Sequence, residues 1–347
     1  MRKNGNKLTA VILTLLLITI LSLLAGCSSD EHKKQPVNVL IVPKFEIDEM
    51  TGDFPGEAQL FYEQYCPECE ETEIRNLPET AHFYYNEENG AAILVTGYGK
   101  TAAGLSMMAL LSSDMYDFSD TYIVSVGCGG GSADETIFGD VVLVTAACDF
   151  DLGHHVDSSD IDNPSGNVQW FPQEEDKAYG CEMLNADLCE TAYQKIKDCP
   201  LQTTDISKKV MNQNFSEEKT DRDTPAVIKG TALTGDNYWK GSVGHKTAEY
   251  IAEYYGCPDP YAVTETEEVV IAHAAECAGM LDRVISLRVI VNMDMFLNNQ
   301  SPEELWGNQA GFIGDATDDE GETLDIFEPA MHNLFDAASI IIDDILN

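Results

Sequence analysis

The chain has 347 residues, with 20 basic and 60 acidic side chains and a formal net charge of −40 at pH 7. Hydrophobic residues make up 44% of the chain, which supplies enough apolar surface for a large core and excludes wholesale disorder. Nucleic-acid binding needs lysine and arginine side chains that displace counterions from phosphates. The large acidic excess therefore excludes nucleic acid as a partner.

The first 27 residues have the pattern of a secretory signal. Basic residues within 1–7 precede an apolar run at 8–24, and small residues lead to Cys27. The ending Leu-Ala-Gly-Cys resembles the lipobox of bacterial lipoproteins, which implies removal of residues 1–26 and lipidation of Cys27. We therefore expect an extracytoplasmic protein anchored to the bacterial cell membrane. An uncleaved transmembrane anchor is the alternative.

The body of the chain, after a polar tether at 27–36, alternates between strand and helix patterns. Compact apolar runs indicate strands, and apolar residues at helical spacing indicate helices. In chain order we expect a strand at 38–42, a helix at 57–65, a hairpin of strands at 82–86 and 91–96, a helix at 101–112, strands at 121–126 and 139–145, helices at 181–197 and 245–255, a strand at 261–263, a helix at 265–280, a strand at 284–291 and a helix at 324–346.

This alternation predicts an α/β fold with a largely parallel central sheet. The periodicity is lost between about 150 and 224, where only the helix at 181–197 stands out. We interpret that stretch as a polar insertion over the edge of the sheet.

Glycine-rich segments follow two of the expected strands. One contains Gly97 and Gly99 and opens a helix, and the other, Ser125-Val-Gly-Cys-Gly-Gly-Gly, contains Gly127 and Gly129. Glycines let backbone N–H groups approach an oxygen-rich ligand closely, and ligands of open α/β sheets bind beyond the carboxyl ends of strands. Taken alone, each segment also fits a tight turn between packed elements.

A run of glutamates follows the strand expected at 261–263. The sequence Thr264-Glu-Thr-Glu-Glu opens the next helix, where the helix dipole favours a carboxylate, so simple capping is one interpretation. The other is that Glu267 accepts hydrogen bonds from the vicinal hydroxyls of a sugar, because a carboxylate offers only acceptors.

Together these segments resemble the nucleoside phosphorylase superfamily. Residues 97–103 resemble its G-x-G-K-x-x-A turn, residues 125–142 its T-G-x-A-G-G and G-D-V-V segment, and residues 262–273 the surroundings of the nucleosidase E-M-E motif. Within the superfamily the chain best resembles the purine nucleoside permease family, through Phe54-Pro-Gly-Glu-Ala-Gln-Leu-Phe61, Thr234-Gly-Asp-Asn-Tyr-Trp-Lys-Gly241 and Phe327-Glu-Pro-Ala-Met-His-Asn333. The resemblance implies one nucleoside-phosphorylase-like domain over 37–347, with a mixed central sheet flanked by helices.

The resemblance also implies roles for individual residues. Glu267 matches the carboxylate that holds the ribose 2′- and 3′-hydroxyls. Together with Glu265 it flanks Thr266, which stands where the family has a methionine under the sugar. Glu57 matches an early acidic residue that activates water in the nucleosidases. Purine nucleosides are thus the expected ligands.

Other residues bear on the purine base. Asn292 stands where the nucleosidases have an aspartate that acts on the purine N7. An asparagine can donate a hydrogen bond to N7 but cannot protonate it, which leaves Asp294 as a substitute acid. Tyr238 and Trp239 could stack on a purine or pack in the core, and His245 could contact the sugar.

Three functions stay open. The first is cleavage of the N-glycosidic bond of purine nucleosides, which Glu57 and Glu267 favour. The second is capture of nucleosides for a separate membrane transporter without catalysis, which Asn292 and the name of the resembled family favour. The third is a structural role. We expect no cofactor and no metal ion, and self-association into a homo-oligomer stays open.

For an enzyme, the distribution of cations favours hydrolysis over phosphorolysis. A phosphorylase holds a phosphate dianion, usually with arginines, and this chain has only Arg2, Arg75, Arg222, Arg283 and Arg288. None lies in the glycine segments, and Lys44 and Lys100 are the cations expected beside strand ends. A water activated by Glu57 needs no such cationic site.

Overall fold

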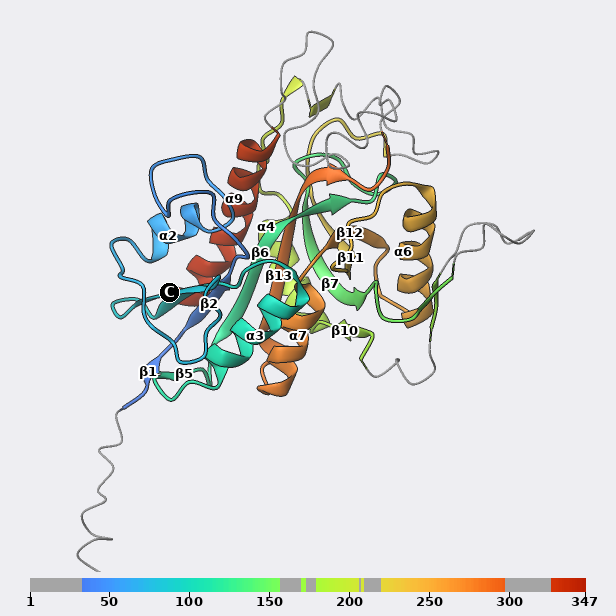
Figure 1. Cartoon of the computed structure of the whole chain (residues 1–347). Helices are drawn as coiled ribbons and strands as arrows, with labels where there is room; N and C mark the ends of the chain where they lie inside the picture. The colour runs from blue at the N-terminus through green and yellow to red at the C-terminus, as the bar shows by residue number, and fades with distance from the viewer. Residues whose placement is uncertain (1–32, 157–169, 173–178, 206, 209–219, 297–325) are drawn as a thin grey trace, which may run out of the picture.

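The computed structural model describes residues 33–156, 170–172, 179–205, 207–208, 220–296 and 326–347 (Figure 1). The expected signal segment 1–26, Cys27 and most of the tether lie outside the described residues, as do parts of the range 150–224. Within the described ranges, no helix has the length and apolar character needed to cross a membrane.

A nine-stranded sheet forms the centre of the protein. Its strands are β2 (Val39–Val42), β3 (His82–Asn86), β4 (Ala91–Val95), β6 (Tyr122–Gly131), β7 (Val141–Asp149), β10 (Cys181–Met183), β11 (Val227–Thr234), β12 (Tyr261–Glu265) and β13 (Val284–Met293). Neighbours follow the order β10-β7-β11-β12-β6-β2-β4-β3, and β13 pairs with both β6 and β7. The short strands pair as β1 (Gln35–Pro36) with β5 (Tyr116–Asp117) and β8 (His154–His155) with β9 (Trp170–Phe171).

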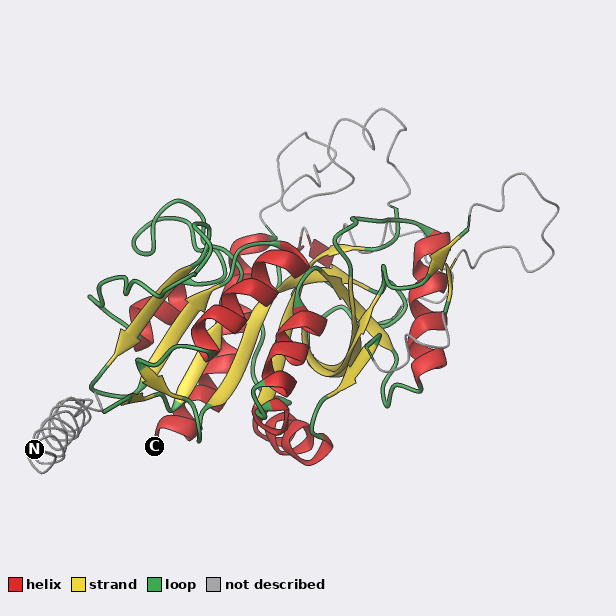
Figure 2. Cartoon of the chain, turned by 60° about the horizontal axis from the view of Figure 1, so that its bottom comes forward, coloured by secondary structure: helices red, strands yellow, loops and turns green. Residues whose placement is uncertain are grey.

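Five of these strands close into a ring. β6 pairs with β13, β13 with β7, β7 with β11, β11 with β12, and β12 again with β6. The β6–β13, β7–β11 and β11–β12 pairs are parallel and the other two are antiparallel. Figure 2 shows the strands curling at this end of the sheet, while β2, β4 and β3 continue outward from β6.

Helices cover both faces of the sheet. α3 (Gly99–Leu111) and α7 (Glu268–Cys277) pack together in front of it in Figure 1, and α9 (Phe327–Leu346) lies behind it. α9 also contacts α2 (Gln59–Tyr65) and α4 (Ala186–Ile196), and α6 (Ser242–Tyr255) packs on the ring. With both faces covered, β4 is buried along its whole length and is apolar throughout rather than alternating.

Apolar spacing decides which face of α9 is buried. Buried residues recur every three or four positions, at Phe327, Ala330, Met331, Leu334, Ala337, Ala338, Ile341 and Ile342. This spacing forms one stripe along a helix, and the stripe packs against β13 and β6. The C-terminal helix therefore closes the core behind the strands that carry the candidate site.

The predicted α/β fold, with a mixed central sheet and flanking helices, is confirmed. Five of the nine strand pairs in this sheet are parallel and four are antiparallel, so the sheet is mixed. The glycine run at 127–131 is not a loop after the strand. It continues β6, because these residues pair with β13 on one side and, at their end, with β12 on the other.

The expected starts of α7 and α4 are wrong as well. Glu265 ends β12, and α7 begins at Glu268, because Glu265 Oε2 accepts the backbone N–H groups of Glu267 and Glu268 at 2.6 and 2.7 Å and so caps the helix. Cys181–Met183 is an edge strand paired with β7, and α4 begins only at Ala186. β11, one of the five strands that form the ring, is not predicted from the sequence.

Candidate functional site

A buried arginine stands at the centre of the candidate site. Arg288, on β13, is 1% exposed. Its Nη2 lies 3.0 Å from Glu265 Oε2 and 3.1 Å from Glu268 Oε2, and its Nη1 lies 3.5 Å from Glu267 Oε2. Burial opposes the charge, but these three carboxylates hold the pKa of Arg288 above its ordinary value. The junction between β12 and α7 thus supplies three counter-charges to one guanidinium.

Glu57 reaches the same cluster from the segment before α2. Its Oε2 accepts the backbone N–H of Lys44 at 2.8 Å, and its Oε1 accepts that of Cys128 at 2.7 Å. The residue is 3% exposed. A carboxylate offers about four lone-pair directions, so these two bonds leave acceptor capacity for a further donor such as water.

The approach of Glu57 to Arg288 requires a glycine at position 127. A Cβ at Gly127 would lie 2.8 Å from Arg288 Nη1 and 3.0 Å from Glu57 Oε1. A Cβ at Gly129 would lie 2.5 Å from Val263 Cγ2 on β12. The glycines of β6 therefore admit two charged side chains and a neighbouring strand.

Glu267 connects the cluster to the N-terminus of α3. Its Oε1 accepts the backbone N–H of Gly99 at 2.9 Å and the hydroxyl of Thr266. Gly99, Thr266 and Arg288 thus engage this carboxylate. Sugar hydroxyls would have to share its oxygens with these three groups or replace the groups. Gly97, whose N–H donates to the Lys44 carbonyl at 3.0 Å, adopts φ +81°, a conformation that favours glycine.

A buried lysine ties the strand ends together. Lys44 Nζ donates to Ser125 Oγ at 2.7 Å and to the carbonyls of Val42 and Val126, both at 2.9 Å. Burial first, and then the charge of Arg288, lower the pKa of Lys44 to about 8. The three hydrogens of the ammonium group are all used, so Lys44 serves the protein rather than a ligand.

Two exposed tyrosines stand beside the carboxylates. Tyr98 is 62% exposed and Tyr238 is 65% exposed. Partial burial and the charge of Glu57 raise the pKa of the Tyr98 phenol, and partial burial and the charge of Glu267 raise that of Tyr238. Phe45 stacks on Tyr98 with ring centroids 5.0 Å apart. Both tyrosine side chains are thus largely exposed beside the carboxylates.

Trp239 is packed differently from its neighbour Tyr238. Its ring stacks on Phe150 with centroids 5.0 Å apart and an interplanar angle of 14°, and its centroid lies 6.3 Å from that of Tyr261. A Cβ at Gly244 would lie 2.1 Å from the indole. These contacts correspond to the core-packing interpretation of Trp239.

His245 and Asp294 form a second buried cluster. His245 Nδ1 lies 2.6 Å from Asp294 Oδ2, which also accepts the Tyr261 hydroxyl at 3.1 Å, and His245 Nε2 lies 3.2 Å from Asp134 Oδ2. Burial favours the neutral imidazole, but the hydrogen bond and charge of Asp294, followed by the charge of Asp134, raise the pKa of His245 to about 9. His245 is therefore a cation at neutral pH, with Asp294 as its counter-ion.

The contacts of Asp294 are relevant to its predicted role as the acid that protonates the purine N7. Its Oδ1 accepts the backbone N–H of Ala133 at 3.2 Å, so both carboxylate oxygens are engaged. Asn292 is half-buried and faces β6, where a Cβ at Gly130 would lie 3.0 Å from its Oδ1. The structure thus places Asp294 with His245 and Asn292 against the glycine strand, and their roles toward a purine stay predictions.

Replacing Asp294 with asparagine should lower the pKa of His245 by about 1–3 units, because the nearest counter-charge is lost while the burial remains. NMR titration of the His245 ring protons measures this shift, and Asp282→Asn on the surface is the control. In the unmutated protein the pKa of His245 is raised from 6.5 to about 9. The stability that the pair provides is therefore complete below pH 6.5 and is lost as the pH rises through about 9. An unchanged pKa in Asp294→Asn would contradict the pairing.

Lys100 is engaged at the opening of α3. Its Nζ lies 2.9 Å from Asp149 Oδ1 and 3.0 Å from Asp151 Oδ2, and its backbone N–H donates to Asp236 at 2.8 Å. Arg288, Lys44 and Lys100 thus each have protein partners.

Two groups of potential metal ligands occur in the part of the chain that the structure describes. Within each group the donor atoms lie within 4.8 Å of one another; the groups are Cys148, Cys181 and Cys257, and Asp134, His245 and Glu249. Cys148 and Cys181 form a disulfide. The absence of a metal and of a cofactor stays an expectation from the sequence.

Sequence analysis does not assign Arg288, Glu268, Cys128 or Tyr98 to the site. A lone arginine inside an apolar strand was the signal for Arg288, since such a residue needs buried counter-charges. Cys128 belongs to the cluster because its backbone N–H donates to Glu57 Oε1 at 2.7 Å and its carbonyl accepts from Arg288 Nη1 at 3.3 Å. Burial and the charge of Glu57 raise the pKa of its thiol. The strand register that places Arg288 opposite Gly127 brings Arg288 to the site. The sequence alone does not reveal this register.

The profile of the purine nucleoside permease family matches residues 36–347. The chain belongs to this family. A probable purine nucleoside permease of Schizosaccharomyces pombe is 24% identical over 284 residues, which covers 76% of this chain and 77% of that protein. A purine nucleoside permease of Candida albicans is 25% identical over 169 residues, which covers 43% of this chain and 39% of that protein.

Solved nucleosidases share the fold of this family member. The 5′-methylthioadenosine/S-adenosylhomocysteine nucleosidase of Neisseria meningitidis has a TM-score of 0.52 and 15% identity, with 89% of this chain and 99% of that chain covered. The corresponding enzyme of Helicobacter pylori has a TM-score of 0.51 and 14% identity, with 90% and 100% covered. The resemblance to the purine nucleoside permease family is therefore confirmed, and the nucleosidases show that the fold is shared.

Proposed function

We propose that the protein binds purine nucleosides and hydrolyses their N-glycosidic bond, with Glu57 as the base that activates water and Glu267 as the sugar-binding carboxylate. The convergence of Glu57, Glu267 and Arg288 at the glycine strand carries the proposal. Family membership and the nucleosidase fold support a nucleoside-related function.

The geometry supports a water nucleophile. Glu57 is held by two backbone N–H groups and keeps acceptor capacity, so a water can donate a proton to it. Arg288 lies beside it, and the positive charge of its guanidinium can stabilise charge that develops on the water. The exposed rings of Tyr98 and Tyr238 offer stacking surfaces for the base.

The same geometry disfavours phosphate. The guanidinium of Arg288 is neutralised by three glutamates, Lys44 donates to protein oxygens, and Lys100 is paired with two aspartates. A phosphate dianion that enters this region would meet carboxylates. Each of these three cations is already engaged by protein groups. Hydrolysis rather than phosphorolysis is therefore the proposed reaction.

Incubation of the purified mature protein with inosine and with adenosine, with and without phosphate, tests the proposal. We expect free base and free ribose at a rate that does not depend on phosphate. Ribose-1-phosphate, formed with a strict need for phosphate, would replace hydrolysis by phosphorolysis. Nucleoside binding without base release would instead support the second candidate function, which is capture of nucleosides without catalysis.

That second function is capture of nucleosides for a separate membrane transporter, without catalysis. Two observations favour it. Asn292 cannot protonate the purine N7, and both oxygens of Asp294 are already engaged by protein donors. The measurement of base release separates the two functions directly.

Replacing Glu267 with glutamine should weaken nucleoside binding by about 1.5–3 kcal/mol, the scale of hydrogen bonds to a charged group. The neutral amide loses the charge and one acceptor oxygen that the sugar hydroxyls would use. Isothermal titration calorimetry measures the affinity, and Glu276→Gln at the exposed end of α7 is the matched control. Unchanged affinity would remove Glu267 from the sugar site.

The proposal includes a location at the outer face of the cell membrane, through a lipid on Cys27. Support comes from the signal pattern and the Leu-Ala-Gly-Cys ending. Replacing Cys27 with alanine should block processing and leave an unlipidated precursor, which membrane fractionation and a lipid label detect. Wild-type protein free in the medium without lipid would refute the anchor.

A further inference from the structure

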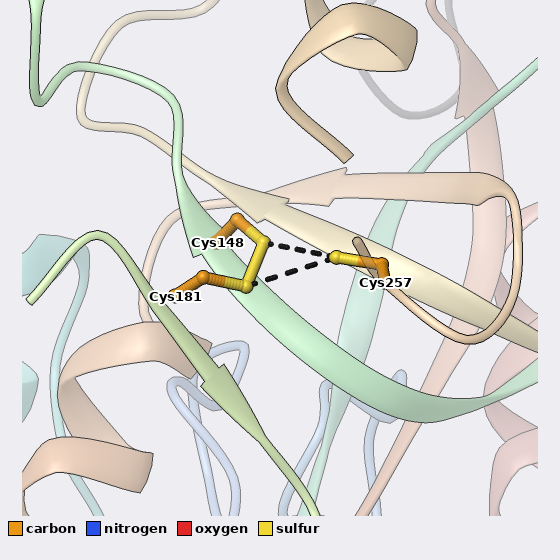
Figure 3. A group of neighbouring side chains, drawn as sticks. All are labelled: Cys148, Cys181 and Cys257. Carbon is orange, nitrogen blue, oxygen red and sulfur yellow. Dashed lines mark hydrogen bonds between the residues drawn. A yellow bond between two sulfur atoms is a disulfide. The ribbon is translucent and has the colours of Figure 1, made fainter. Parts of the chain in front are cut away.

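Three cysteines from distant parts of the chain meet beside the ring of strands. Cys148 lies near the end of β7, Cys181 opens β10, and Cys257 follows the C-terminus of α6. Cys148 and Cys181 are cross-strand neighbours joined by a disulfide. Figure 3 shows the third sulfur beside that bond, with Cys257 Sγ 3.3 Å from Cys148 Sγ and 3.8 Å from Cys181 Sγ.

We propose that these cysteines form a thiol–disulfide exchange site, in which Cys257 displaces Cys181 from Cys148. Exchange proceeds by attack of a thiolate on one sulfur of a disulfide. The Cys257 sulfur lies beside the bond, 3.3 Å from Cys148 Sγ and 3.8 Å from Cys181 Sγ, so a side-chain rotation brings it in line with the bond for attack on Cys148, the nearer sulfur. Attack there expels Cys181. The proposal is independent of the nucleoside function.

Electrons and protons balance within the protein. The Cys257 thiolate donates an electron pair to Cys148 Sγ, the bond between Cys148 and Cys181 breaks, and its electron pair leaves with Cys181. The proton lost by Cys257 is taken up by Cys181. One disulfide and one thiol exist before and after, so the step needs neither an oxidant nor a reductant.

The surroundings favour Cys181 as the leaving thiol. Cys148 is fully buried, whereas Cys181 is half-buried on an edge strand that pairs with β7 over three residues. Water can therefore reach the expelled sulfur. The backbone N–H of Cys257 donates to the Ala252 carbonyl at 3.0 Å, which fixes the attacking residue at the end of α6.

The exchange would move a cross-link and expose a modification site. The disulfide joins β7 to β10 before the step, and it joins β7 to the end of α6 afterwards. α6 is the helix that carries the buried His245. The released Cys181 thiol then becomes available to alkylating reagents and to small disulfide compounds.

Alkylation with iodoacetamide after incubation of the folded mature protein, followed by acid quenching and peptide mapping without reduction, tests the proposal. The wild-type protein should yield both disulfides, with label on Cys181 in molecules that contain the Cys148–Cys257 bond. Cys257→Ser should lower the labelling of Cys181 by about tenfold or more, because its displacement needs the third thiol. Cys277→Ser, at an exposed cysteine, is the matched control.

A second variant keeps the test decisive. Cys181→Ser should form the Cys148–Cys257 disulfide on air oxidation, with the fold checked by circular dichroism. The proposal is overturned if folded Cys181→Ser leaves both remaining cysteines open to alkylation. It is equally overturned if wild-type protein shows only the Cys148–Cys181 bond at equilibrium, a result that needs no variant to fold.

Discussion

Replacing Glu57 with glutamine should lower the rate of nucleoside hydrolysis by about 10²–10⁴-fold, the range that a positioned general base contributes. A carboxylate can take a proton from water, and an amide cannot. The two backbone donors that hold the Glu57 side chain leave it with acceptor capacity for a water. The kcat for inosine or adenosine hydrolysis measures the loss, while nucleoside affinity should change by about 1 kcal/mol at most.

The controls for this prediction separate chemistry from folding. Glu70→Gln, an exposed change a few residues after α2, should keep the wild-type rate. In Glu57→Gln the amide NH₂ faces the backbone N–H of Lys44 or of Cys128 and cannot accept its bond, so the unfolding midpoint is measured alongside kcat. A folded variant with unchanged kcat would remove Glu57 as the base.

The sequence predicts those elements whose pattern is local. The hairpin of β3 and β4 follows from two strand runs on either side of the turn residues at 87–90, and α9 follows from helical spacing; the structure confirms both. β11 carries Lys229 and Gly230 in its first half, which breaks the apolar run that identifies the other strands of the ring. Its place between β7 and β12 comes from tertiary pairing, which a local pattern does not contain.

The candidate site is predictable in part for the same reason. The glutamate run at the end of β12 marks, in the sequence, the junction that we propose binds the sugar, but the assignment of capping to Glu265 depends on backbone geometry. The glycines of β6 indicate a turn when read alone. In the structure they are strand residues without side chains, because Arg288 and Glu57 occupy the space that a Cβ at Gly127 would need. Close packing between distant strands therefore decides what this motif does.

Replacing Arg288 with methionine should lower the free energy of unfolding by about 3–5 kcal/mol, the cost of leaving buried charges without their partner. Methionine keeps an unbranched apolar stem and removes the guanidinium. The carboxylates of Glu265, Glu267 and Glu268 then remain buried together. Because folded domains are stable by roughly 5–15 kcal/mol, this one change removes a large share of the stability.

The pH dependence of that loss distinguishes lost charge pairing from lost packing. Burial raises the pKa of Glu268, but Arg288, Lys44 and Ser125 together hold it below its ordinary value. Without Arg288, burial and mutual repulsion should raise the pKa of these carboxyl groups above their unfolded values. The folded variant then binds protons more tightly than the unfolded chain does, so its stability deficit should shrink as the pH falls from about 7 to about 5.

Urea unfolding at both pH values measures this change in the deficit. The control is Arg283→Met, at a position just before β13 and outside the cluster, which should cost about 1 kcal/mol at either pH. A deficit in Arg288→Met that does not change with pH would show that the arginine stabilises the site by packing and not by pairing with the glutamates.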